Sequence, residues 1–170
     1  MTLSSAVAHE IRFDGVRVRY DSDKSYDELL TALLADIGEK PVPINEFATT
    51  AGGWQEYQQR AESYVGPSGF MLFSLIDHGA WITKAGIERK VVRVILGNPL
   101  IAITMLRHDV TAGLFAPVEV LVMDEGDSRS SLTYVKPSSL MVVEPNPELL
   151  STARELDAKL AALAEKVASN

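Results

Sequence analysis

Cysteine is absent from the 170 residues of this chain. Its absence excludes disulfide bonds, thiolate metal sites, iron–sulfur ligation and a cysteine nucleophile. Histidine is scarce, with three residues in all. Two of them, His78 and His108, lie in the most apolar part of the chain, between residues 70 and 110.

Long apolar runs and an excess of positive charge are also missing. No apolar run approaches the ~20 residues of a membrane-spanning helix. The first ten residues, MTLSSAVAHE, lack the basic segment and apolar core of a secretion signal. The net charge of −7 and a pI near 5.0 disfavour binding to phosphate backbones. We therefore expect a cytoplasmic protein with neither a membrane nor a nucleic acid as partner.

The composition is that of a folded protein. Hydrophobic residues make up 46% of the chain and charged residues 23%, which is too apolar for a disordered chain. A chain of this length can bury roughly 70% of the surface that its unfolded form exposes. We expect one domain over residues 1–170, with a flexible leader at residues 1–10 and a C-terminal helix at residues 148–168.

Hydrophobic periodicity predicts an α+β fold. Apolar or alternating runs indicate strands at 11–20, 70–76, 80–84, 91–96, 118–124 and 131–135. Apolar residues at three- and four-residue spacing indicate helices at 25–37, 54–64, 99–110 and from 148 onward, while 44–50 is a loop or a short helix and 138–143 is extended or a turn. Because most neighbouring strands are joined as hairpins, with one turn at Asp77-His78-Gly79, we expect a largely antiparallel sheet of about five to six strands with three to four helices packed on it.

Several linked segments resemble one protein family. They are GFMLFSLIDHG, GNPLIAITMLRHDVTAGLFAPVEVLVMDE, SLTYVKPSSL and ELDAKLAAL, in this order over the second two-thirds of the chain. Together they are similar to the domain of unknown function 302 family. The resemblance implies a small α+β domain that forms a homodimer, and it implies no activity and no catalytic residues.

Asp77 and His78 are the best candidates for chemistry. They form a titratable pair at the end of a predicted strand, where an imidazole can act as an acid, a base or a ligand near neutral pH. A histidine that ties a tight turn to a neighbouring carbonyl is the structural alternative. No nucleophile motif of the Gly-x-Ser-x-Gly type occurs.

The other candidate ligand-binding residues are Asn98, Met105, His108 and Tyr134. Asn98 precedes Pro99 at a predicted helix start, where free amides can hold an anion. Met105 and His108 are three residues apart and share a helix face, as haem or soft-metal ligands can, although a core methionine and a helix-end histidine are the favoured explanation. Tyr134 lies in the strand of the SLTYVKPSSL segment. We expect no dedicated metal site, and the residues specify no cofactor.

Three classes of function remain open. The leading hypothesis is a non-catalytic homodimeric domain that binds a small molecule between its sheet and the helix at 99–110, because excess apolar surface with a few polar groups at its rim is typical of a ligand cavity. The alternatives are an enzyme that uses His78 as general acid or base, oriented by Asp77, and a metal- or haem-binding protein.

Overall fold

A single antiparallel sheet is the centre of the structure. The computed structural model describes residues 5–50 and 52–170. Its sheet has five strands in the order β1-β5-β4-β3-β2, and every neighbouring pair is antiparallel. The strands are β1 (Arg17–Ser22), β2 (Met71–Asp77), β3 (Val91–Gly97), β4 (Val118–Gly126) and β5 (Arg129–Val135). The predicted α+β class with a largely antiparallel sheet is confirmed.

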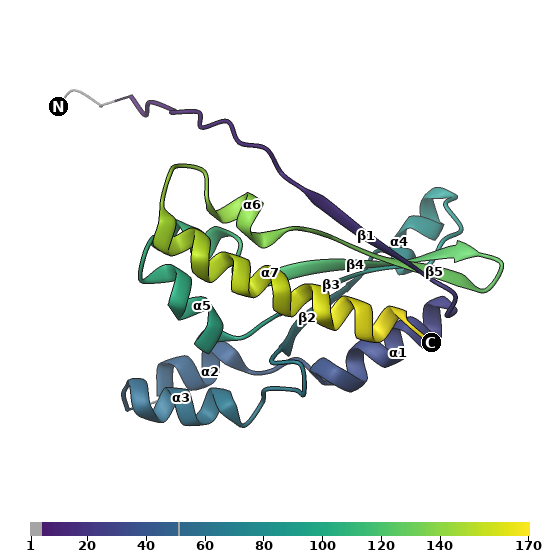
Figure 1. Ribbon diagram of the computed structural model, residues 1–170. Helices are drawn as coiled ribbons and strands as arrows, with labels where there is room; N and C mark the ends of the chain where they lie inside the picture. Colours follow the sequence, from purple (N-terminus) through teal and green to yellow (C-terminus); the bar gives the residue numbers. More distant parts are fainter. Residues whose placement is uncertain (1–4, 51) are drawn as a thin grey trace.

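The described residues contain seven α-helices, which is more than the three or four predicted. The long helices α1 and α7 lie across one face of the sheet, and α2 and α3 form a pair to one side of it (Figure 1). The helices are α1 (Tyr26–Ile37), α2 (Ile44–Thr50), α3 (Trp54–Glu62), α4 (His78–Ile82), α5 (Pro99–Leu106), α6 (Pro137–Met141) and α7 (Pro147–Ala168), with short 3₁₀ helices η1 (Thr83–Ala85) and η2 (Val110–Leu114). None of them is both long and apolar enough to cross a membrane.

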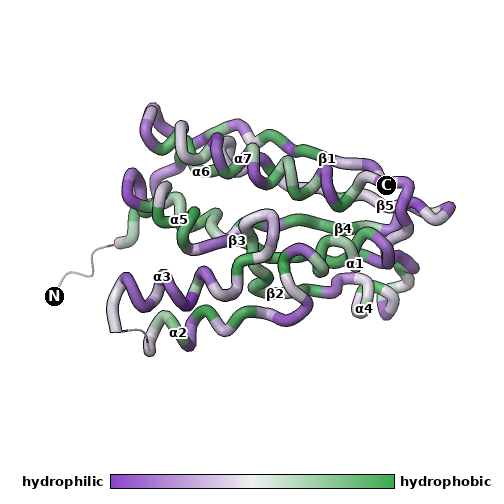
Figure 2. Tube along the Cα trace, turned by 60° about the horizontal axis from the view of Figure 1, so that its bottom comes forward, coloured by the Kyte–Doolittle hydropathy of each residue, from purple (hydrophilic) through white to green (hydrophobic). Residues whose placement is uncertain are grey.

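The core lies between the sheet and the two long helices. Alternate residues of β3 and β4, such as Val94 and Val120, point to α1 and α7 and are almost fully buried. The predicted apolar stripe of the last helix faces them, with Leu156 and Leu160 at most 3% exposed. The central strands are predominantly hydrophobic and α3 is predominantly hydrophilic (Figure 2). Periodicity therefore identified the buried face of each long element.

Polar side chains at the helix starts place the main helices where the sequence predicts them. Ser25 and Glu28 form a reciprocal capping box at the start of α1. Asn98 and Asn146 cap α5 and α7, and each is followed by a proline, which lacks the amide that would otherwise go unpaired.

The predicted hairpin at Asp77-His78-Gly79 is wrong. The chain turns there into the short helix α4 and then η1, because the Asp77 carboxylate accepts a hydrogen bond from the amide of Ala80 and starts a helical turn. Gly79 packs against the backbone before β3, where an added Cβ would lie 2.9 Å from the carbonyl oxygen of Arg89. The segment at 80–84, predicted to be a strand, is therefore helical.

Two other segments also differ from the predicted boundaries. The helix predicted at 99–110 ends at Leu106, because the Asp109 carboxylate accepts a hydrogen bond from the amide of Thr111 and starts η2 separately. The segment predicted to be extended at 138–143 contains α6 instead. Of the leader predicted at 1–10, residues 1–4 lie outside the described residues, and residues 5–10 are extended and exposed.

Asp36, at the end of α1, connects three parts of the chain. Its side chain is 2% exposed and accepts hydrogen bonds from the amide and hydroxyl of Ser68 and from Lys166 on α7, the last at 2.5 Å. Burial raises the pKa of Asp36, but these hydrogen bonds outweigh it and hold the pKa below its usual range. Gly66 allows the loop that carries Ser68 to approach the end of α1, since an added Cβ would lie 1.8 Å from the carbonyl oxygen of Asp36.

We predict that Asp36→Asn lowers the free energy of unfolding by about 2 kcal/mol at pH 7, because charged hydrogen bonds are lost at a buried site. The folded pKa of Asp36 lies below the unfolded one, so its stabilisation is present at neutral pH and is lost as the pH falls through the folded value. Urea unfolding at pH 7 and at pH 3 measures both effects. If the variant loses the same amount of unfolding free energy at pH 3 as at pH 7, this account is wrong.

Candidate functional site

An apolar cavity lies where α5 crosses the end of the sheet. Its volume is about 280 Å³, and its walls come from β2, the β3–α5 turn, α5, the segment before β4, and α7. The side chains that define it include Phe73, Asn98, Ile101, Met105, Pro117 and Leu156. Segments that are far apart in the sequence therefore form one cavity between the sheet and the helix that begins at Pro99.

The Gly97-Asn98-Pro99 turn holds the cavity together. A Cβ on Gly97 would lie 3.1 Å from the ring of Phe73 and 3.2 Å from Pro117, so a larger residue would force one of these two walls to shift. The Asn98 side chain accepts a hydrogen bond from the amide of Leu100 and donates one to the carbonyl oxygen of Gly69. Its amide group thus has partners within the protein.

The chemical character of the cavity follows from these partners. No aspartate, glutamate, lysine, arginine or histidine of the described residues is among those that line it, and Asn98 is the only side-chain amide there. A ligand in this cavity would be recognised by shape and apolar contact rather than by charge.

Of the predicted ligand-binding residues, Asn98 and Met105 both line the cavity, and Met105 is 1% exposed. His108 lies beyond the end of α5, is exposed, and contributes its backbone carbonyl to a hydrogen bond from Asn146. The prediction that Met105 and His108 share a helix face is wrong, because α5 ends at Leu106.

Tyr134 lies apart from the cavity, on β5. Its ring stacks on Tyr20 with 6.4 Å between the ring centroids, and burial raises its pKa, as does the neighbouring Tyr20. It borders a larger groove of about 810 Å³, whose walls also include Arg17, Arg93 and Leu121. The structure therefore separates Tyr134 from Asn98 and Met105.

Asp77 and His78 lie at the opposite end of β2 from the cavity. Met71, at the start of β2, pairs with Gly97, whereas Asp77 pairs with Val92 at the other end of β3. Asp77 is bound to the amide of Ala80, and His78 Nδ1 accepts a hydrogen bond from the indole of Trp81 at 3.2 Å. Within residues 5–50 and 52–170, no three histidine or carboxylate side chains are grouped as metal ligands.

A polar depression adjoins Asp77. Its walls include Tyr26, Asp77, Lys90 and Asp124. Burial, together with the carboxylates of Asp77, Asp27 and Asp124, raises the pKa of Tyr26 to about 12. No residue spacing in the sequence indicates this group, because its members come from α1, the end of β2, and the segments around β3 and β4.

The sequence indicated some of the cavity walls and missed others. The Gly-Asn-Pro turn and the apolar helix after it predicted the β3 and α5 side. Phe73, Pro117 and Leu156 were missed, because each reads as an ordinary core or loop residue until the tertiary structure brings them to α5.

Comparison with known families matches residues 46–167 to the family described as "Domain of unknown function DUF302". The chain belongs to this family. The DUF302 region includes all the residues that line the cavity except Ile44, together with Asp77, His78 and most of the sheet, while β1 and α1 precede it. The predicted family resemblance is thus confirmed.

A solved structure has the same fold as this DUF302 chain. It is the crystal structure of an uncharacterized conserved DUF302 protein from Bacillus stearothermophilus, with a TM-score of 0.62 and 15% sequence identity. The match covers 89% of this chain and 97% of that one. The comparison with curated proteins found no match. At this level of identity the similarity concerns the fold.

We predict that Asp77→Ala lowers the free energy of unfolding by about 1 kcal/mol, because it removes the cap of α4. Asp77→Asn keeps an oxygen acceptor and should retain most of the stability. Thermal unfolding of both variants measures the effect. Equal destabilisation by alanine and asparagine would mean that the charge of Asp77, rather than its cap, matters.

Proposed function

We propose that this chain is a non-catalytic, homodimeric, single-domain module that binds a small apolar molecule in the cavity beneath α5. The observation that supports the proposal is the apolar pocket itself, at the place between sheet and helix where the sequence predicts a ligand. Folded proteins are otherwise close-packed, with few voids larger than a water molecule.

The size of the cavity suggests a class of ligand. Apolar cavities of about 150 Å³ can hold benzene. The cavity here has about 280 Å³ and no charged wall, which suits an uncharged bicyclic aromatic or a short alkyl chain. A carboxylate or phosphate would lose its hydration there without gaining a partner.

The position of α5 offers a route of entry. This helix is apolar along nearly its whole length, yet Met105 is its only fully buried residue, and Leu100, Ile101 and Ile103 remain half-buried. A wall with one side towards solvent can move more easily than a core element. Small displacements of α5 would admit a ligand without unfolding the sheet.

The proposal does not involve acid–base catalysis. The side chains of Asp77 and His78 hydrogen-bond to Ala80 and Trp81 rather than to one another, and they lie at the other end of β2 from the cavity. An enzyme of the kind considered from the sequence would need Asp77 to orient the His78 ring.

We predict that the protein enhances the fluorescence of the uncharged probe 1-aminonaphthalene, and that Ala102→Leu weakens this binding about ten-fold or more. Ala102 lines the cavity, so added methyl groups overfill it. Thr104→Leu is the matched control, because Thr104 is exposed on the same helix. Equal affinity of both variants, each folded by circular dichroism, would contradict binding beneath α5.

Homodimer formation is the second part of the proposal. Eleven large hydrophobic side chains are exposed among the described residues, six of them on residues 7–16 and on η2, so this surface has an apolar cluster without a cover. We predict a species of twice the 18.6 kDa chain mass in sedimentation velocity at micromolar concentration. A single species at the mass of one chain would refute it.

A further inference from the structure

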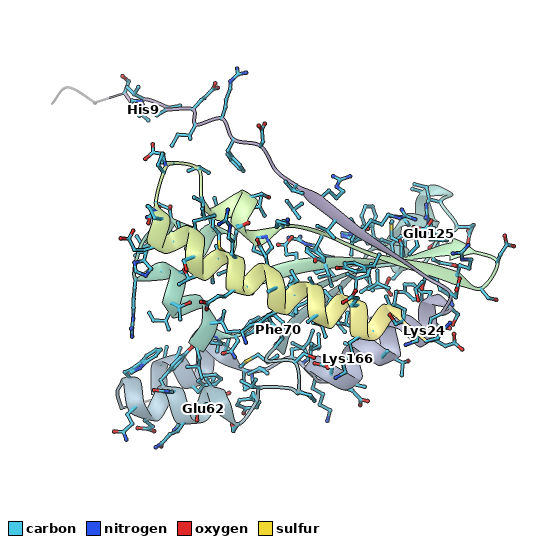
Figure 3. All side chains as sticks on the ribbon, viewed as in Figure 1. His9, Lys24, Glu62, Phe70, Glu125 and Lys166 are labelled. Carbon is cyan, nitrogen blue, oxygen red and sulfur yellow. The ribbon has the colours of Figure 1, made fainter. Side chains whose placement is uncertain are left out.

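Residues 5–16 form an arm that leaves the body of the protein. The arm continues the direction of β1 beyond the sheet, and all of its residues are exposed (Figure 1). His9, on this arm, lies away from the sheet and helices (Figure 3). Up to residue 15, no backbone amide or carbonyl of the arm hydrogen-bonds to another described residue; the first bonds are those of Val16 with Ser139 and Lys136.

The arm nevertheless has the side-chain pattern of a paired strand. Val7, Ile11 and Phe13 lie with His9 on one face of the extended chain and are 74%, 58% and 44% exposed. Glu10, Arg12 and Asp14 lie on the other face. An exposed extended segment with unpaired backbone groups and apolar side chains is a site at which another strand can pair.

The apolar face of the arm contacts the body at one point. Phe13 contacts Phe115 edge to face, with 6.5 Å between the ring centroids. Next to Phe115, η2 presents Val110 and Leu114, which are 77% and 80% exposed. The base of the arm, at Phe13, therefore meets a part of the body that also exposes apolar side chains.

We infer that the arm is covered by a second copy of the chain, whose arm pairs antiparallel with the first about a two-fold axis at Ile11. The inference rests on the homodimer of the proposed function and names its contact. In this register Glu10 of each chain lies opposite Arg12 of the other, so the symmetric dimer contains two cross-strand ion pairs. Neither residue has an ion-pair partner within the described part of one chain.

The alternative register, with Phe13 on the axis, is less favourable. It would place Arg12 opposite Asp14 but leave Glu10 opposite the apolar Val16. Pairing about Ile11 uses residues 7–15, all of which have free backbone groups.

A single cysteine tests this geometry directly, because the chain has none of its own. Residues directly opposite in an antiparallel pair have Cα atoms about 4.5–5.5 Å apart, within the range of a disulfide. Ile11→Cys should therefore form a disulfide-linked dimer under mild oxidation. Ile87→Cys is the matched surface control, since Ile87 is 53% exposed, and it should remain largely monomeric on a non-reducing gel.

Asp14→Cys controls for random collisions between arms. In the proposed register it faces residue 8 of the other arm, so the two introduced sulfurs would lie about 20 Å apart. Cross-linking of Ile11→Cys at least about ten-fold faster than of Asp14→Cys is expected. Equal rates for the two arm positions, or for Ile11→Cys and Ile87→Cys, would overturn the inference even if the protein is a dimer.

Exchange of the two charges provides an independent test. Arg12→Glu and Glu10→Arg each place like charges opposite one another twice and should raise the dimer dissociation constant about ten-fold. The double variant E10R/R12E restores both pairs at unchanged net charge, so it should return to within about two-fold of wild type. Failure of this rescue would overturn the register.

The tests of arm pairing are independent of the test of ligand binding. 1-Aminonaphthalene should bind Arg12→Glu as it binds wild type, because the arm contributes no residue to the cavity beneath α5. A strictly monomeric wild type would overturn both the homodimer and the arm pairing, whereas probe binding would then still support the cavity.

Discussion

Burial of one face of the sheet beneath α1 and α7 is the interaction on which the rest of this structure depends. Side chains such as Leu33, Val94, Leu132 and Leu160 meet there and are at most 1% exposed. Each contributes roughly 1.5–3 kcal/mol by leaving water. The contact also orients α5 and α6, because both pack against α7.

The cavity is a consequence of this arrangement. α7 spans the sheet and brings Leu156 to its far end, while α5 starts from β3 at Gly97 and crosses the same end. Pro117 approaches from the start of β4, so three walls meet without a side chain long enough to fill the centre. At the rim, the side chain of Asn98 links the start of α5 to the segment before β2 through its hydrogen bonds with Leu100 and Gly69.

Much of the fold followed from local signals, and the main error has a tertiary cause. Capping residues such as Ser25 and Asn98 and the stripe of α7 act within a few residues, so the sequence predicted those elements well. The failure at Asp77-His78-Gly79 arose because apolar residues at 80–84 fit a strand as readily as a short helix. The close approach of Gly79 to the segment before β3 decides between them, and it is a tertiary contact.

The sequence by itself determined the α+β class, the family, the buried face of each long element and the helix that covers the cavity, because periodicity and helix capping depend on near neighbours. Only the tertiary structure decided which candidate residues meet. It joined Asn98 and Met105 to Phe73, Pro117 and Leu156, and it placed Asp77 and His78 at the other end of β2. Strand pairing and helix packing connect residues that are far apart along the chain, and no local spacing records such contacts.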